Sequence, residues 1–287
     1  MILLNLKSMC TRKGLSVTFL IVFLCLPLYP QTQETDYYNL QNTLKFSDFL
    51  IRTRQYELAA QELERAAFLA PGNRGVQLKL LKTYRLGKQY HQSISTVERL
   101  YMNRLMEMPA EFGKEYLRSL ILSGDYDRAD YFIGTAGNLE QADRNNYTLS
   151  ILLLKRNWEE ARAFAAENLP VNMRLAGIAG ESESIRYKSA GLALAMSAIV
   201  PGSGKIYTGK WKDGLISLVF VAANAYQAYR GFNKHGIESV HGWVFCTLAT
   251  GFYAGNVYGS YKSARIYNNR LDEALQQKAL DTFRSGL

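Results

Sequence analysis

Two apolar stretches decide the fold expected for this chain: Gly-Leu-Ile-Ser-Leu-Val-Phe-Val-Ala-Ala-Asn-Ala-Tyr at 214–226 and Gly-Trp-Val-Phe-Cys-Thr-Leu-Ala-Thr-Gly-Phe-Tyr-Ala-Gly at 242–255. Neither stretch carries a charge, and the polar loop 230–241 separates them. Uncharged runs of this kind are typical of membrane-spanning helices, because a charged side chain is costly in hydrocarbon. We therefore expect a transmembrane helical hairpin with spans at 215–229 and 243–261. A buried helical hairpin in a soluble protein is the alternative.

The second expected span contains a regular pattern of small residues. Gly251, Gly255 and Gly259 recur at four-residue spacing and so lie on one face of a helix. In lipid such a face permits close backbone contact, either within the hairpin or between two copies of the chain. Asn256 lies in the same span, where an uncharged polar side chain usually bonds to a neighbouring helix. Among single residues, Asn256 is the strongest candidate for a functional role.

A glycine-rich turn precedes the first stretch. Pro201-Gly202-Ser203-Gly204 ends an apolar helix expected over 190–200. Lysines and aromatic residues then alternate up to residue 214, a pattern typical of a membrane–water boundary. The run Gly-Ser-Gly-Lys does not complete a phosphate-binding loop, because Ile199 and Ile206 occupy the positions that require Gly and Ser or Thr. Nucleotide binding is therefore not predicted.

Two motifs organise the block 189–268. The first, Ser-Ala-x-x-Pro-Gly-x-Gly-x-x-Tyr-x-Gly, is formed by Ser197, Ala198, Pro201, Gly202, Gly204, Tyr207 and Gly209. The second, Tyr-x-Gly-Asn-x-Tyr-Gly followed by Tyr-Asn, is formed by Tyr253, Gly255, Asn256, Tyr258, Gly259, Tyr267 and Asn268. On these residues the block resembles a bacterial membrane module often found after tetratricopeptide-like repeats, and its first motif is similar to the core of TM2-type hairpins. The resemblance implies a membrane hairpin and no established reaction. The candidate site residues are Pro201, Gly202, Gly204, Tyr207, Gly209, Gly251, Gly255, Asn256 and Gly259.

The segment 36–170 carries an internal repeat. Its aromatic markers, spaced by 34, 36 and 32 residues, are Tyr56, Tyr90, Tyr126 and Trp158. A period near 34 predicts helix–turn–helix units in which each aromatic opens the second helix of a pair. Small residues three positions later let the paired helices approach; they are Ala59, Ser93, Ala129 and Ala161. The expected core positions of the first helices are Phe46, Leu50, Leu80, Tyr84, Tyr116, Leu120, Tyr147 and Ile151.

The first two units resemble the tetratricopeptide repeat family. The matching residues are Tyr56, Ala59, Ala66, Pro71, Leu80, Tyr84, Tyr90 and Ser93. The third and fourth units depart from the family pattern, because no proline separates them and Gly134 and Gly137 interrupt the third. The resemblance implies a superhelix whose concave face binds peptides or proteins. The alternative is that these helices pack only on one another or on the C-terminal block.

The remaining segments have simpler patterns. Residues 1–31 combine a basic start with a short apolar core, which predicts a signal peptide, with an uncleaved signal anchor as the alternative. Residues 171–188 are expected to be a linker. Residues 269–287 show the spacing of an amphipathic helix, which could lie on a membrane or pack against the repeats.

Charge and cysteine content exclude several classes of function. The chain has a formal net charge of +9. Its lysines and arginines are spread along helices and beside the apolar runs, which favours lipid headgroups over nucleic acid. The three cysteines are too dispersed for a disulfide framework or a metal site. No catalytic, cofactor-binding or metal-ligating constellation stands out, and no enzymatic activity is expected.

Together these features predict an all-α protein, a helical-repeat superhelix followed by a transmembrane hairpin. The expected function is a membrane-anchored scaffold of the bacterial cell envelope, with periplasmic repeats, that serves as an assembly or insertion accessory. Its expected partners are a protein bound by the repeats, membrane lipid, and a second copy bound through the Gly251, Gly255 and Gly259 face, but no nucleic acid. The alternative is a membrane-embedded enzyme or transport component that uses the segment 201–214 and Asn256.

Overall fold

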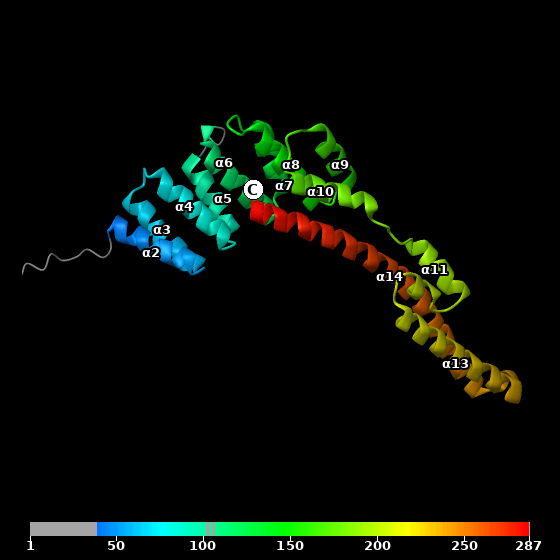
Figure 1. Cartoon of the computed structure of the whole chain (residues 1–287). Coiled ribbons are helices and arrows are strands. Elements are labelled where there is room, and N and C mark those ends of the chain that lie inside the picture. The colour runs from blue at the N-terminus through cyan, green and yellow to red at the C-terminus, as the bar shows by residue number, and fades with distance from the viewer. Residues whose placement is uncertain (1–38, 102–103, 105–106, 287) are drawn as a thin grey trace, which may run out of the picture. The chain divides into compact units, whose positions relative to one another are not determined.

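The computed structural model describes residues 39–101, 104 and 107–286, and every regular element in these residues is a helix (Figure 1). The all-α part of the prediction is confirmed. The expected signal peptide at 1–31 lies outside the described residues. The chain divides into two compact units, Met1–Thr83 and Tyr84–Leu287.

Helices of similar length follow one another through the repeat region. Their bounds are α2 Leu40–Arg52, α3 Tyr56–Leu69, α4 Arg74–Leu86, α5 Tyr90–Tyr101, α6 Ala110–Ser123, α7 Tyr126–Thr135, α8 Gln141–Leu154 and α9 Trp158–Glu167. Each even-numbered helix leads into a second helix that begins at the aromatic residue of its repeat. The observed helix starts therefore agree with the spacing in the sequence.

The turns inside these helix pairs share one backbone geometry. The residue two positions before each aromatic is left-handed: Arg54, Lys88, Gly124 and Arg156 have φ values of 60°, 60°, 84° and 62°. The next residue's N–H then bonds to a carbonyl five residues back, as from Gln55 N to Leu50 O at 2.8 Å and from Asp125 N to Leu120 O at 2.9 Å. This is the arrangement by which a left-handed residue ends a helix. The four turns are structurally equivalent although one of them alone uses glycine.

The core of the first unit forms where α2 packs on α3. Leu50, Ala59, Leu63 and Ala66 are all buried there. Phe46 was expected in this core, but its side chain is 49% exposed, so that prediction is wrong. It lies four residues before Leu50, and the ring stacks instead on its neighbour Phe49 (6.4 Å between ring centroids).

The second unit continues the repeats and then adds the C-terminal block. After α9 come α10 Met173–Glu181, η2 Ser182–Ser184, α11 Ala190–Ile199, α12 Ser203–Tyr207, α13 Trp211–His235, η3 Gly236–Glu238 and α14 Val240–Gly286. The segment 171–188, expected to be a linker, thus contains α10 and η2. The amphipathic helix expected at 269–287 is no separate element, because α14 runs without a break to Gly286.

The long helix α14 connects the hairpin to the repeats within this unit. Its N-terminal half lies along α13 and α11, and its C-terminal half runs back to α8 and α10 (Figure 1). Leu275, Ala279 and Phe283 are buried there, and the ring of Phe283 lies 6.3 Å from that of Tyr147. The amphipathic face of residues 269–287 therefore packs against the repeats.

The transmembrane hairpin is not supported. Within the described residues, no helix combines the length and the apolar character needed to cross a membrane. The predicted spans 215–229 and 243–261 do form antiparallel helices, but they are rich in alanine, glycine, threonine and tyrosine, which are less apolar than leucine or isoleucine. Asn224 and Gln227 further interrupt the first. The fold class is therefore helical without the transmembrane element, and the predicted membrane-anchored location in the cell envelope is withdrawn with it.

Candidate functional site

The glycine-rich turn at 201–204 brings three helices into backbone contact. Gly202 has a φ of +90°, and a Cβ atom on it would lie 2.0 Å from the carbonyl oxygen of Gly214 at the start of α13. A Cβ on Gly204 would lie 1.9 Å from the carbonyl oxygen of Ala193 in α11. These distances are far inside van der Waals contact. The turn therefore needs glycine at both positions, and Pro201 precedes it at the end of α11.

A chain of buried hydroxyl groups fixes the same junction to α14. Ser197 Oγ accepts a hydrogen bond from Gly204 N at 2.9 Å and lies 2.7 Å from Ser260 Oγ. Ser260 Oγ in turn donates to the carbonyl oxygen of Asn256 at 2.9 Å. Because the Ser260 proton is used in that bond, Ser197 must donate to Ser260. This series of hydrogen bonds therefore runs from α12 through α11 to α14, and each group in it donates to the next.

Two other residues of the first motif, Tyr207 and Gly209, lie just before α13. The phenolic oxygen of Tyr207 accepts a hydrogen bond from Ser189 N at 3.3 Å, and the Lys188 ammonium group lies 4.7 Å from its ring centroid. Gly209 adopts a φ of +83° in the turn before α13. Both residues shape the entry into the hairpin.

The glycine face of α14 does not form the close helix contact that its spacing suggests. A Cβ on Gly251 or Gly255 would meet no atom within 4 Å. The helices α13 and α14 approach closely at the tip of the hairpin instead, where a Cβ on Gly231 would lie 2.6 Å from Gly242 N. The face is therefore open at Gly251 and Gly255, whereas Lys205 covers Gly259, and its use in pairing two copies of the chain stays a prediction.

Asn256 is buried beside this open face. Its side chain is 3% exposed, and neither the amide nitrogen nor the amide oxygen has a hydrogen-bond partner. The expected bond to a neighbouring helix is thus not formed. A buried amide without partners costs about 1–3 kcal/mol. Such a group points to a ligand more strongly than a satisfied one does.

A cavity of about 320 Å³ adjoins Asn256 between α13 and α14. Lys205 enters it from α12, and its ammonium group donates to Ser217 Oγ at 2.8 Å. Of the described residues that line the cavity, Lys205 alone is charged. The structure thus brings together Asn256 and the segment 201–214, the two regions that the sequence singled out. The remaining lining residues are Ile216, Phe220, Gly251, Phe252 and Gly255.

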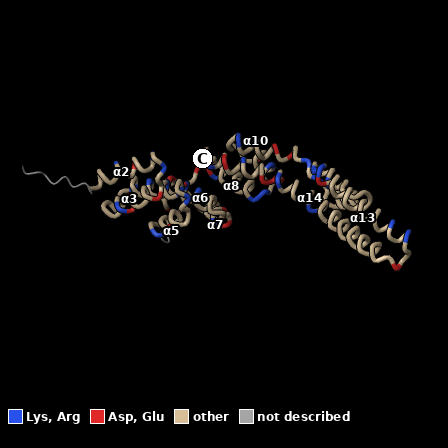
Figure 2. Tube along the Cα trace, turned by 90° about the horizontal axis from the view of Figure 1, so that it is seen from below, with Lys and Arg blue, Asp and Glu red and all other residues tan. Residues whose placement is uncertain are grey.

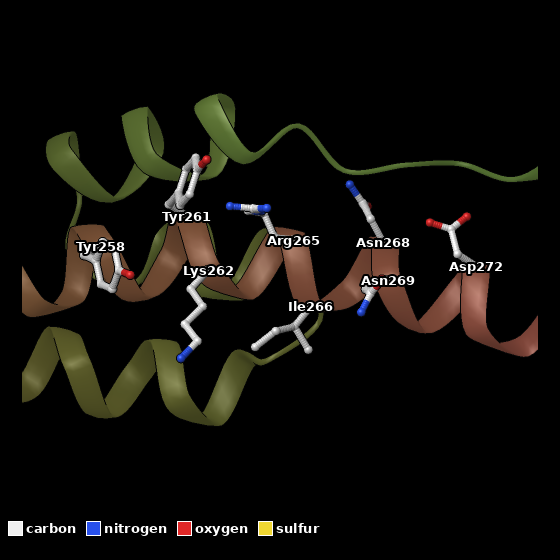
Figure 3. Close-up of a pocket in the computed structure, with 8 residues that line it drawn as sticks. All are labelled: Tyr258, Tyr261, Lys262, Arg265, Ile266, Asn268, Asn269 and Asp272. Carbon is white, nitrogen blue, oxygen red and sulfur yellow. The ribbon is translucent and has the colours of Figure 1, made fainter. Parts of the chain in front are cut away.

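A second cavity of about 460 Å³ lies along α14 closer to the repeats (Figure 3). Its polar side chains Asn268, Asn269 and Asp272 already have partners in the protein. Asn268 bonds in both directions to the backbone of Lys188, at 2.8 and 2.9 Å. Asn269 Oδ1 accepts a hydrogen bond from Arg156 at 2.9 Å. Figure 3 shows Asn268 and Asp272 projecting toward the segment before α11. These residues therefore hold the hairpin to the repeats and leave little for a ligand.

Asp272 is the centre of this contact, and it makes the contact sensitive to alkali. Its Oδ1 accepts bonds from the Tyr187 hydroxyl at 2.6 Å and from Trp158 Nε1 at 3.0 Å. Burial and the bond to Asp272 raise the pKa of Tyr187 from 10.0 to about 12. Since the folded pKa is the higher one, the bond stabilises the fold fully below pH 10.0 and is lost as the pH rises to about 12.

Replacing Tyr187 by phenylalanine tests this alkaline sensitivity. We expect Tyr187→Phe to be less stable than the natural chain below pH 10.0, and the difference to shrink as the pH approaches about 12. Denaturant unfolding of both proteins across this range measures the difference in their free energies of unfolding. The other tyrosines are present in both proteins, so their contributions to the pH dependence cancel in this difference. A difference that is constant with pH would contradict the assignment.

Charged residues mark the ends of the hairpin and link the first helices of the repeats. Figure 2 shows the middle of α13 and the adjoining part of α14 without charge, with lysines and arginines gathered toward both ends. In the repeats, ion pairs join helices one repeat apart: Asp48 with Lys79 in the first unit, and Arg85 with Glu115 and Lys114 with Asp143 in the second. The first helices therefore present a surface of paired charges.

Large apolar side chains are exposed elsewhere in the first unit. Phe46 and Phe49 on α2 are each about half exposed, and Phe68 on α3 is 83% exposed. Their exposure could not be read from the sequence, because Phe46 occupies a core position of the repeat pattern. The repeat pattern does not tell whether another helix covers these two rings.

Comparison with family models, curated proteins and solved structures found no match for this chain. In the described part of the chain, no group of three or more His, Cys, Asp or Glu side chains is placed to hold a metal ion.

Proposed function

We propose that the chain is a helical-repeat scaffold that binds a protein partner through its first helix pair. The observation that supports this proposal is the stacked pair Phe46 and Phe49, whose rings are about half exposed with an interplanar angle of 12°. Aromatic side chains are enriched at protein interfaces, where they bury a large apolar area. The proposal keeps the partner-binding role expected from the repeats and drops the membrane anchor.

The chemistry of the partner follows from the surroundings of these rings. By helix spacing, Asn42 and Lys45 lie beside them on α2, four residues before Phe46 and Phe49. A protein interface commonly combines an apolar centre with such a polar rim. The partner surface that fits best is the apolar face of an amphipathic helix, with leucine or aromatic side chains to cover the rings and polar groups at its edges.

Photo-crosslinking in cells that express the chain tests the proposal. A benzophenone amino acid in place of Phe49 keeps an aromatic side chain at the site, and the same residue at Leu58 serves as the control, since Leu58 is 49% exposed on α3. We expect one protein to be crosslinked repeatedly from position 49 and not from position 58. Equal products from both positions would argue against a specific surface.

The affinity of the purified partner then measures the contribution of the rings. Replacing Phe46 and Phe49 by alanine should weaken binding by about 30-fold or more, the loss typical of an interface anchor. Leu58→Ala should change affinity by less than about threefold, as for most interface-remote truncations. Unchanged thermal stability of both variants would show that the loss comes from the surface. If the alanine pair binds as tightly as the natural chain, the proposal is wrong.

A further inference from the structure

The cavity beside Asn256 carries an inference that is independent of partner binding by the repeats. The buried amide of Asn256 has no partner, Lys205 is the charged residue of the lining, and the adjoining glycine face is open at Gly251 and Gly255. We propose that this cavity binds a single-chain amphiphile in which an acyl chain is joined through an amide to a carboxylate. N-Acyl amino acids are the simplest members of this class.

The amide side chain of Asn256 is the first group of the cavity that the ligand has to match. An asparagine side chain offers N–H donors and a carbonyl acceptor side by side, and both of these atoms lack partners here. A carboxylate alone would leave Asn256 Oδ1 unsatisfied, since a carboxylate has no donor. The N–H and C=O of a trans secondary amide point in opposite directions, so one amide group cannot bond to both atoms. In an N-acyl amino acid the amide N–H can donate to Asn256 Oδ1 while the neighbouring carboxylate accepts from Asn256 Nδ2.

The carboxylate of the ligand would accept a hydrogen bond from Lys205. The Lys205 ammonium group bonds to the Ser217 hydroxyl at 2.8 Å, which holds it at the cavity. An ammonium group has three donors, so donors remain for an anion. A Cβ placed on Gly259 would lie 3.3 Å from Lys205 Cε and 3.7 Å from its Nζ, so the cation lies over Gly259. Bonds between an ammonium group and a carboxylate are among the stronger hydrogen bonds in proteins.

The acyl chain would pack against the apolar end of the cavity. Phe220 and Phe252 lie with their ring centroids 5.3 Å apart, and Gly251 and Gly255 leave room along α14. Among the residues that line the cavity, those with polar side chains are Lys205, Ser217 and Asn256. An extended peptide on this surface would leave its own N–H and C=O groups without partners, which is costly. A methylene chain has no such groups, and it is the occupant that we favour.

The order of these groups along α14 matches the order of groups in the ligand. The apolar residue Phe252 precedes Asn256 by four residues, and Gly259 with Lys205 above it follows by three. At a rise of about 1.5 Å per residue, the amide and carboxylate positions are separated by roughly 4.5 Å along the helix. One methylene group between an amide and a carboxylate spans a comparable length. N-Dodecanoylglycine is therefore a suitable probe.

Calorimetric titration of the full chain with N-dodecanoylglycine, below the concentration at which it forms micelles, tests the proposal. We expect one molecule to bind per chain. Dodecanoate, which lacks the amide, and dodecanoylglycine methylamide, which lacks the charge, should each bind at least about tenfold more weakly. Equal affinity for all three would show a non-specific apolar surface and would overturn the proposal.

Matched variants assign the binding to this cavity. Asn256→Leu and Lys205→Met should each weaken binding by about tenfold to a hundredfold, while Lys262→Met, which removes an exposed cation outside the cavity, should not. Gly255→Leu should abolish binding by filling the cavity, since a Cβ at this position meets no atom within 4 Å, and its thermal unfolding checks that the variant is folded. Gly177→Leu on α10 is the control, because its Cβ is equally free.

The test also separates the other occupants. An acetylated peptide ending in leucine that binds more tightly than N-dodecanoylglycine would assign the cavity to a peptide C-terminus and overturn the amphiphile. A change from dimer to monomer in Gly255→Leu, with ligand affinity unchanged, would assign the open glycine face to a second copy of the chain. Failure of the crosslinking experiment on the first helix pair would leave this proposal standing, since the two sites share no residue.

Discussion

Replacing Glu115 by leucine is expected to destabilise the second unit by roughly 3–5 kcal/mol, the usual loss when one partner of a buried ion pair is removed. The Glu115 side chain is 1% exposed. It accepts hydrogen bonds from Arg85 Nε at 2.7 Å and from Arg118 Nη1 at 2.6 Å. Without the carboxylate, two largely buried guanidinium groups would repel each other with no compensating charge. Denaturant unfolding followed by circular dichroism measures the loss.

An exposed ion pair of the same unit provides the control. Lys278 and Glu181 lie 2.5 Å apart, but their side chains are 58% and 49% exposed. Replacing Glu181 by glutamine should therefore cost less than about 1 kcal/mol. Removing both arginines together with the carboxylate, in Arg85→Met/Glu115→Leu/Arg118→Met, should recover part of the stability lost in Glu115→Leu. Equal losses from Glu115→Leu and Glu181→Gln would contradict the role of burial.

The helix pairs of the repeat region could be predicted because their signals are local. The aromatic residues at 56, 90, 126 and 158 each begin a helix, as their spacing indicates. The turn before each of them depends on one left-handed residue and one backbone bond, both within a few positions in sequence. Non-glycine residues in that conformation, such as Arg54 and Lys88, gave no visible signal because lysine and arginine are common everywhere on helices.

Burial could not be predicted with the same success, because neighbours one repeat away decide it. Phe46 occupies a core position of the pattern but is half exposed, whereas the charged residue Glu115 is buried completely. Position within a helix tells which face a residue lies on. It does not tell whether another helix covers that face, or whether that helix brings two arginines to meet a carboxylate.

The C-terminal block shows the limits of apolar patterns most clearly. The two apolar stretches do form an antiparallel helix pair, but the transmembrane assignment is wrong for the described helices. Alanine, glycine and tyrosine count as apolar in a simple pattern while contributing little to the energy of insertion into lipid. Asn256 was singled out from the sequence as an unusual polar residue, but its cavity depends on Lys205 and Ser217, whose approach follows from the geometry of the turn at 201–204.

That turn provides the second large effect. Replacing Gly204 by alanine is expected to destabilise the second unit by about 3 kcal/mol or more, at the upper end of the range for overpacking. The added Cβ would lie 1.9 Å from the carbonyl oxygen of Ala193 and 2.8 Å from Ser197 Oγ. A backbone carbonyl cannot rotate away as a side chain can, so α11 and α12 must separate. Their separation would break the bond from Gly204 N to Ser197 Oγ.

The same substitution at Gly255 isolates the cause. Its Cβ would meet no atom within 4 Å, and alanine is favoured over glycine inside a helix by roughly 0.5–1 kcal/mol. Gly255→Ala should therefore stabilise the unit slightly, while Gly204→Ala destabilises it strongly. Hydrogen exchange should show the loss locally, with faster exchange of the Gly204 amide and of the last turn of α11. Similar stability of the two variants would mean that the glycine-rich turn is looser than these contacts require, and the position of Lys205 at the cavity would then have no rigid support.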